Sequence, residues 1–166
     1  MGAKDYTFDE STGVVTLKTS FTSWIAAQGL SGADTAFDAD PDRDDIPNGL
    51  EFVLGGEPNP ANPNSNSTGL LPTASEASGG LIFSFKRKVV SASAVELTFQ
   101  WTTDLSFTSP ANDIPVGAGN SVTNDVNVAI AQGVPDSLTD TVIITVPAAK
   151  AAGAKLFGRL KAVQVP

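Results

Sequence analysis

An acidic segment between Asp40 and Glu51 has the residue types and the spacing of a cation-binding loop. Counted as twelve positions, it carries side-chain oxygens at positions 1, 3, 5, 9 and 12, which are Asp40, Asp42, Asp44, Asn48 and Glu51. Position 7 is Ile46, which offers its backbone carbonyl oxygen. The four carboxylates of this set repel one another unless a hard divalent cation lies between them. The segment therefore predicts a calcium site whose ligands are all oxygens.

The spacing is that of an EF-hand loop, with two departures. Position 6, where glycine normally allows a positive φ, is Asp45, a residue type that enters the left-handed region more readily than most. Position 8 is Pro47, which lacks the N–H group through which paired loops bridge to each other. We therefore expect a solitary loop, similar to those of dockerin-type and thrombospondin type 3-like repeats. The alternative is an acidic loop that is solvated and binds no metal.

The predicted ligand set favours calcium over magnesium. All of its donor atoms are oxygens, and the side chain of Glu51 is long enough to bind through both carboxylate oxygens. Such a set gives a coordination number of about seven at distances of about 2.4 Å, whereas magnesium requires a smaller octahedron. We therefore expect Ca²⁺ as the cofactor.

The composition of the 166-residue chain excludes several kinds of chemistry. It contains no histidine and no cysteine, so Ser-His-Asp and Cys-His catalysis, typical zinc sites and disulfides are excluded. The net charge is −8, and seven of the 18 acidic residues lie between Asp34 and Glu51, which argues against nucleic acid as a partner. No apolar run reaches the roughly eighteen residues that span a membrane. Residues 1–4 lack the apolar region of a signal peptide, so we expect none.

Two short helices are predicted on either side of the acidic segment. Phe21, Trp24 and Ile25 recur at helical spacing before it, and apolar residues within 50–54 do so after it. We expect Phe21 and Trp24 to form a small apolar core that belongs to this helical hairpin, not a platform for a ligand. Near the N-terminus, residues 6–18 predict a β-hairpin or two short strands.

The second half of the chain has the pattern of an all-β domain. Residues 58–79 are rich in Pro, Asn and Ser and predict a linker. Beyond them apolar and polar residues alternate, so that Leu97, Phe99 and Trp101 are expected on one face of a strand. The predicted strands cover residues 81–86, 95–101, 114–116, 126–130, 141–146 and 156–163. Turn residues between them predict an antiparallel Ig-like β-sandwich of about six to eight strands.

One basic cluster, Lys86-Arg87-Lys88, falls at the end of the first strand of this domain. We expect its side chains to be solvated at the strand end, as is common for lysines and arginines there. The alternative is contact with an acidic glycan.

These features divide a mainly β chain into four segments. They are an N-terminal hairpin or strand segment (1–19), an EF-hand-like calcium-binding helical hairpin (20–57), a linker (58–79) and a β-sandwich (80–166). The predicted fold is thus a sandwich preceded by a short helix–calcium loop–helix hairpin.

The order of these features resembles the C-terminal module of large secreted, repeat-rich proteins of environmental Gram-negative bacteria. The resemblance is carried by Trp24-Ile25, the 40–51 loop with its continuation to Pro58, and the stretches 81–88, 95–105 and 156–160. In that family an F-x-x-W-I … D-x-D-x-D-G-x-x-N-x-x-E motif precedes a small β-domain, often after autotransporter-associated β-strand repeats, whose end the hairpin at 6–17 resembles. Asp45 replaces the glycine of the motif. The resemblance covers nearly the whole chain and implies calcium binding and an extracellular or cell-surface location.

We therefore expect a non-catalytic calcium-binding module for surface display, adhesion or assembly, with calcium, itself or a cell-surface glycan as partner. One alternative is a subunit of an extracellular filament that lends its N-terminal strand to a neighbour's sheet edge. Another is a carbohydrate-binding accessory domain of a secreted enzyme, which would need an exposed aromatic platform. Catalysis is not expected, because the predicted metal accounts for the acidic cluster and no other carboxylate pair stands out.

Overall fold

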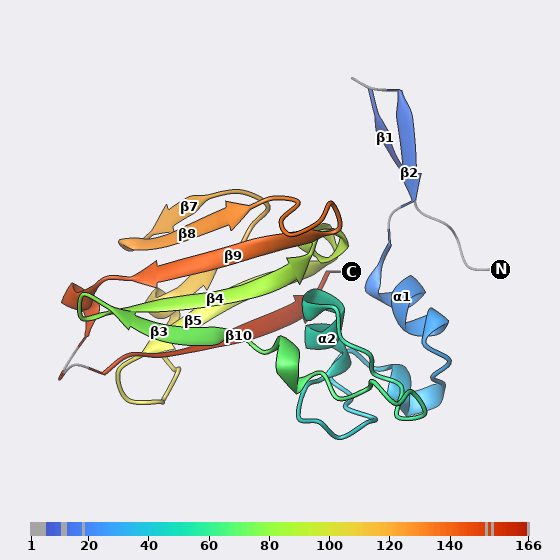
Figure 1. The fold of residues 1–166 in the computed structure, drawn as a ribbon, viewed down its shortest axis with the longest axis horizontal. Coiled ribbons are helices and arrows are strands. Elements are labelled where there is room, and N and C mark those ends of the chain that lie inside the picture. Colours follow the sequence, from blue (N-terminus) through green and yellow to red (C-terminus); the bar gives the residue numbers. More distant parts are fainter. Residues whose placement is uncertain (1–5, 11–12, 18, 152, 154, 166) are drawn as a thin grey trace.

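The computed structural model describes residues 6–10, 13–17, 19–151, 153 and 155–165, and within them the fold is mainly β (Figure 1). The two α-helices are α1 (Phe21–Ala27) and α2 (Asn48–Leu54). The strands are β1 (Tyr6–Asp9), β2 (Val14–Leu17), β3 (Thr73–Ala77), β4 (Gly80–Lys88), β5 (Val95–Thr102), β6 (Asp113–Pro115), β7 (Ser121–Thr123), β8 (Val126–Ala131), β9 (Thr139–Val146) and β10 (Phe157–Gln164). Short 3₁₀ turns η1 (Gly32–Thr35), η2 (Thr68–Leu70), η3 (Val89–Ser93), η4 (Pro110–Asn112) and η5 (Ala148–Lys150) connect them.

Two antiparallel sheets form the body of the molecule. One has five strands in the order β3-β4-β9-β8-β7, and the other has three in the order β10-β5-β6. Strands β4 and β9 pair along their length, from Leu81 opposite Val146 to Lys88 opposite Thr139. The β1–β2 hairpin is a separate two-stranded sheet that projects away from this body in Figure 1.

The two sheets share one apolar core. Alternate residues of β5, namely Val95, Leu97, Phe99 and Trp101, are buried, as the period-two pattern predicts. The ring of Phe99 lies 4.9 Å from the ring of Phe83 on β4 in the other sheet. A Cβ atom on Gly158 of β10 would come within 2.6 Å of the Phe99 ring, so glycine is required where β10 passes this ring.

Helices α1 and α2 belong to that same core. Ser20 caps α1 by accepting a hydrogen bond from the Ser23 N–H at 3.1 Å, and Gly55 ends α2 with φ +86°. Phe21 and Trp24 pack on Phe52 of α2 with ring centroids 5.9 and 5.2 Å apart. Buried residues of both helices and both sheets form one continuous cluster. The expectation of a separate core for the helical segment is therefore wrong.

All six strands predicted after residue 80 are present, and so are the two short strands predicted near the N-terminus. Strands β3 and β7 were not predicted. Every residue of β3 is exposed, so it lacks the alternation that marks a half-buried strand, and β7 has three residues. Because β3 pairs with β4, residues 58–79 are not only a linker: their last part is the edge strand of the larger sheet.

The basic cluster on β4 also differs from its prediction. Lys86 is exposed, but Arg87 is 1% exposed and points into the core. Its Nη2 lies 2.8 Å from Oδ2 of Asp140 on β9, and its Nη1 donates to the Gly117 carbonyl at 2.8 Å. Arg87 is thus a buried structural ion-pair partner, whereas Lys86 is solvated as predicted and Lys88 is half-buried.

Candidate metal site

The backbone of the 40–51 segment wraps around the side chain of Asp40. Oδ1 of Asp40 accepts from the Arg43 N–H at 2.8 Å, and its Oδ2 accepts from the Asp45 N–H at 3.0 Å. Arg43 and Asp45 have φ angles of +62° and +67°. Position 6 therefore adopts the left-handed conformation that glycine usually supplies, with aspartate in its place.

This turn gathers three carboxylates. Asp40, Asp42 and Asp44 each offer an oxygen within 4.8 Å of those of the other two. Oδ1 of Asp44 accepts from the Ile46 N–H at 3.0 Å, which fixes the orientation of that carboxylate. Ile46 is itself buried.

The last two predicted ligands come from the first turn of α2. Asn48 and Glu51 are both completely buried. The Nδ2 group of Asn48 donates to the carbonyls of Asp34 and Ala36 at 2.8 and 2.7 Å, so both of its protons are used. The Phe37 ring covers Gly49, where a Cβ atom would come within 2.2 Å of the ring. Local contacts with residues 34–39 thus hold the start of α2 against the loop.

Four shielded oxygens in this region have no hydrogen-bond partner. They are Oδ1 and Oδ2 of Asp42, Oδ1 of Asn48 and Oε2 of Glu51. Leaving buried acceptors unpaired costs free energy, more so for carboxylates. All three residues occupy predicted ligand positions, and all four atoms are oxygens, as a calcium ion requires. The donor set therefore fits the predicted ion.

Burial, and after it the neighbouring negative charges, raises the pKa values of two of the predicted ligands. Burial, and after it the charges of Asp42 and Asp44, raises the pKa of Glu51 to about 7 despite a hydrogen bond from Ser67. Burial and the nearby carboxylates of Asp40 and Asp44 raise the pKa of Asp42. The ion pairs found among the described residues, Arg87–Asp140 and Lys150–Asp125, involve none of the loop carboxylates. The loop thus lacks a compensating cation from the described chain.

One residue of the site lies outside the predicted set. Ser67, in the segment expected to be a linker, donates from Oγ to Oε1 of Glu51 at 2.7 Å, and its N–H donates to Oδ2 of Asp44. It joins the loop to α2 from 16 residues beyond Glu51. A single serine in a Ser/Asn-rich stretch carries no signal of this role. The structure therefore gathers Asp40, Asp42 and Asp44 and links Asp44 to Glu51 through Ser67, while ligation itself remains a prediction.

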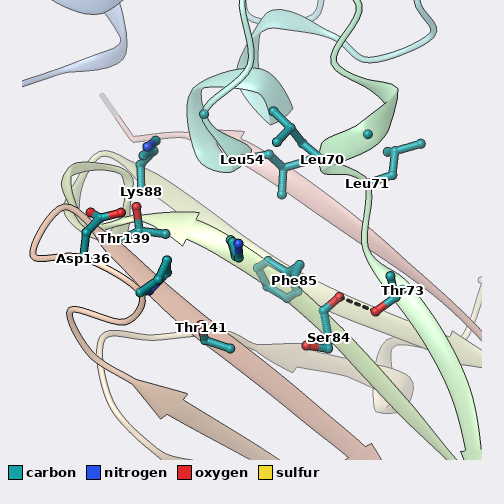
Figure 2. A pocket seen from close by; sticks show the side chains of 14 residues that line it. Leu54, Leu70, Leu71, Thr73, Ser84, Phe85, Lys88, Asp136, Thr139 and Thr141 are labelled. Atoms are coloured by element: carbon teal, nitrogen blue, oxygen red, sulfur yellow. Dashed lines mark hydrogen bonds between the residues drawn. The ribbon is translucent and has the colours of Figure 1, made fainter.

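A second feature is a cleft of about 440 Å³ between the α2–η2 region and the larger sheet (Figure 2). Leu54, Leu70 and Leu71 lie on one side of it, and Thr73, Ser84 and Thr141 lie on the strands opposite. Phe85 in its floor is buried. Among the side chains that the structure describes, Phe8 of the β1–β2 hairpin is the exposed aromatic, and it is not one of the residues that line this cleft. The cleft therefore offers no aromatic platform for a sugar ring.

No family model, curated protein or solved structure matches this chain in the comparisons made. In the part of the chain that the structure describes, no helix has the length and apolar character needed to cross a membrane.

Proposed function

We propose that this chain is a non-catalytic calcium-binding module of an extracellular or cell-surface protein. The observation that supports the proposal is the set of buried, unpartnered oxygens at predicted ligand positions, on Asp42, Asn48 and Glu51. A calcium ion would satisfy these atoms and neutralise the loop carboxylates at once. Extracellular calcium modules bind in the range of about 10⁻⁴–10⁻³ M, which suits a loop with a non-glycine sixth position.

The proposed ligands are the side chains of Asp40, Asp42, Asp44, Asn48 and Glu51 and the carbonyl of Ile46. The ion would hold the acidic turn against the first turn of α2, whose apolar face is part of the core shared with both sheets. In this view the chain is an Ig-like β-sandwich preceded by a helix–calcium loop–helix hairpin, and the metal stabilises the joint between them. Such a module would serve in surface display, adhesion or assembly.

Calorimetric titration of calcium chloride into chelator-treated protein tests this proposal. We expect one ion per chain and a Kd at or below about 10⁻³ M. Glu51→Gln removes a charge and the bidentate contact and should abolish measurable binding. The matched control is Glu96→Gln, which changes an exposed residue of β5. The proposal is wrong if the wild-type chain binds no calcium at millimolar concentrations.

The alternative of a filament subunit is favoured by a separate observation. The β1–β2 hairpin projects from the body (Figure 1), and isolated two-stranded hairpins are marginally stable in water. Strand β10 is an eight-residue edge strand paired only to β5 among the described strands. A strand edge that pairs with no described strand can accept a strand from a second copy of the chain.

Sedimentation and electron microscopy distinguish this alternative from a monomeric module. Strand exchange predicts large species or filaments for the full chain and their loss when residues 1–19 are deleted. A chain that remains monomeric at all accessible concentrations contradicts it. A glycan partner has less support, because the described aromatic side chains do not form an exposed platform.

A further inference from the structure

We propose that Ser67 is a positioning residue of the calcium site, and that residues 57–67 form a strap that closes over the loop when calcium binds. The proposal rests on the proposed function and adds to it a residue and a segment outside the twelve-residue loop. Its basis is the set of contacts that Ser67 makes with two predicted ligands and with the start of the strap.

Ser67 is 3% exposed, although it lies between mostly exposed residues. Its Oγ donates to Oε1 of Glu51 at 2.7 Å and accepts from the Glu57 N–H at 3.1 Å. Its own N–H donates to Oδ2 of Asp44. One serine thus contacts the ligands predicted at positions 5 and 12, which lie in the middle and at the end of the loop.

These bonds fix the orientation of the two carboxylates. The hydroxyl occupies one lone pair of Oε1 of Glu51, while Oε2 remains unpartnered and available to a cation. The bond to Oδ2 of Asp44, together with the Ile46 N–H on Oδ1, fixes that carboxylate on both sides. Groups that orient metal ligands in this way commonly change metal affinity by about 10–100-fold when removed.

Gly56 allows this arrangement. A Cβ atom at position 56 would lie 2.5 Å from Oγ of Ser67 and 2.8 Å from Oε1 of Glu51. The serine and the glutamate therefore meet directly over a glycine, with no space for a larger side chain. The second glycine after α2 has a role at the site, whereas the first, Gly55, ends the helix with its positive φ.

The strap is attached at both of its ends. Near its start, Nδ2 of Asn59 donates to the Gln28 carbonyl at the end of α1 at 2.7 Å. Between this point and Ser67, the hydrogen bonds are local, such as those from the Ala61 and Asn64 N–H groups to nearby asparagine side chains. Closure at Ser67 requires Asp44 and Glu51 to come together, and their repulsion opposes this until a cation lies between them.

Calcium titration combined with hydrogen–deuterium exchange tests the proposal. In the wild-type chain, calcium chloride should slow exchange of the Glu57 and Ser67 amides by about tenfold or more relative to chelator-treated protein. Ser67→Ala should weaken calcium binding by about tenfold and abolish this protection. Gly56→Ala should weaken binding similarly with the serine intact. The control is Ser75→Ala, an exposed serine on β3 that should change neither result.

The outcomes separate this proposal from the proposed function. If the wild-type chain binds no calcium, both are overturned. Suppose instead that the wild-type chain binds calcium, that Ser67→Ala and Gly56→Ala bind it equally tightly, and that calcium does not change amide exchange in residues 57–67. The strap proposal is then wrong, and the proposal of a calcium module stands. Weakened binding in both variants, with loss of calcium-dependent protection, supports the strap.

Discussion

Two regions of this molecule bury charged side chains, and they balance that charge in different ways. In the larger sheet, Arg87 and Asp140 neutralise each other at 2.8 Å, and a backbone carbonyl accepts from the guanidinium. In the 40–51 loop, carboxylates gather around Asp42 and Glu51, and no lysine or arginine of the described chain pairs with them. The described chain thus supplies a counter-charge in the sheet and none in the loop. This contrast favours a bound cation over a merely solvated acidic loop.

The largest effect should come from breaking the internal pair. Arg87→Ala leaves the carboxylate of Asp140 buried without its partner, and we expect a loss of about 3–5 kcal/mol in the free energy of unfolding. Calcium affinity of the folded fraction should not change. Urea denaturation measures the first quantity and calorimetry the second. Lys86→Ala, at the exposed neighbouring position, should stay within about 0.5 kcal/mol of wild type.

If the loop binds calcium as proposed, chelation should have the next largest effect. A ligand at a hundredfold excess over its Kd stabilises by about 2.7 kcal/mol. For a chain of this length that corresponds to about 5–10 °C in Tm. Thermal unfolding followed by circular dichroism should therefore shift by this amount between calcium and chelator. Glu51→Gln should remove the shift. Since helices and sheets share one core, we expect a single transition, and two separate ones would contradict the continuous cluster.

The pH dependence of stability should distinguish the two regions without mutation. Burial raises the pKa of Glu51 to about 7 from its usual 4.5. Between these pH values the folded chain therefore binds more protons than the unfolded chain. The contribution of Glu51 to the free energy of unfolding is fully present below pH 4.5 and is lost as the pH rises through 7. In calcium-free buffer we expect a loss of about 2 kcal/mol over this interval.

Two further measurements of stability against pH test whether Glu51 is the source of this dependence. Saturating calcium favours the ionised carboxylate and should flatten or reverse the slope. Glu51→Gln should flatten it in the absence of calcium as well. A slope in calcium-free buffer that is unchanged by Glu51→Gln would show that other carboxylates cause it.

The smallest effect should come from weakening a helix that belongs to neither charged region. Ser20→Ala removes the N-cap of α1, which should cost about 1 kcal/mol of stability. Calcium affinity should remain within about twofold, because the cap contributes no atom to the loop. A large loss of affinity would mean that α1 positions the site more directly than its contacts indicate.

The sequence by itself determined the local features of this protein. The positions of oxygens along residues 40–51 are fixed by spacing, and the Asp40 carboxylate gathers its own backbone amides within five residues. Strands such as β4, β5 and β9 were predictable because alternate burial leaves a period-two pattern in the residues themselves. The helix stops at Gly29 and Gly55 were likewise encoded locally, through positive φ.

The tertiary structure decided which distant residues meet. Ser67 and Arg87 look like ordinary polar surface residues in the sequence, and only the packing of their segments buries them. Strand β3 carries no apolar pattern because it lies at an exposed edge, where pairing with β4 alone defines it. These roles depend on long-range contacts, such as the one between Arg87 and Asp140, which are 53 positions apart. No local pattern of residue types encodes a partner at that separation.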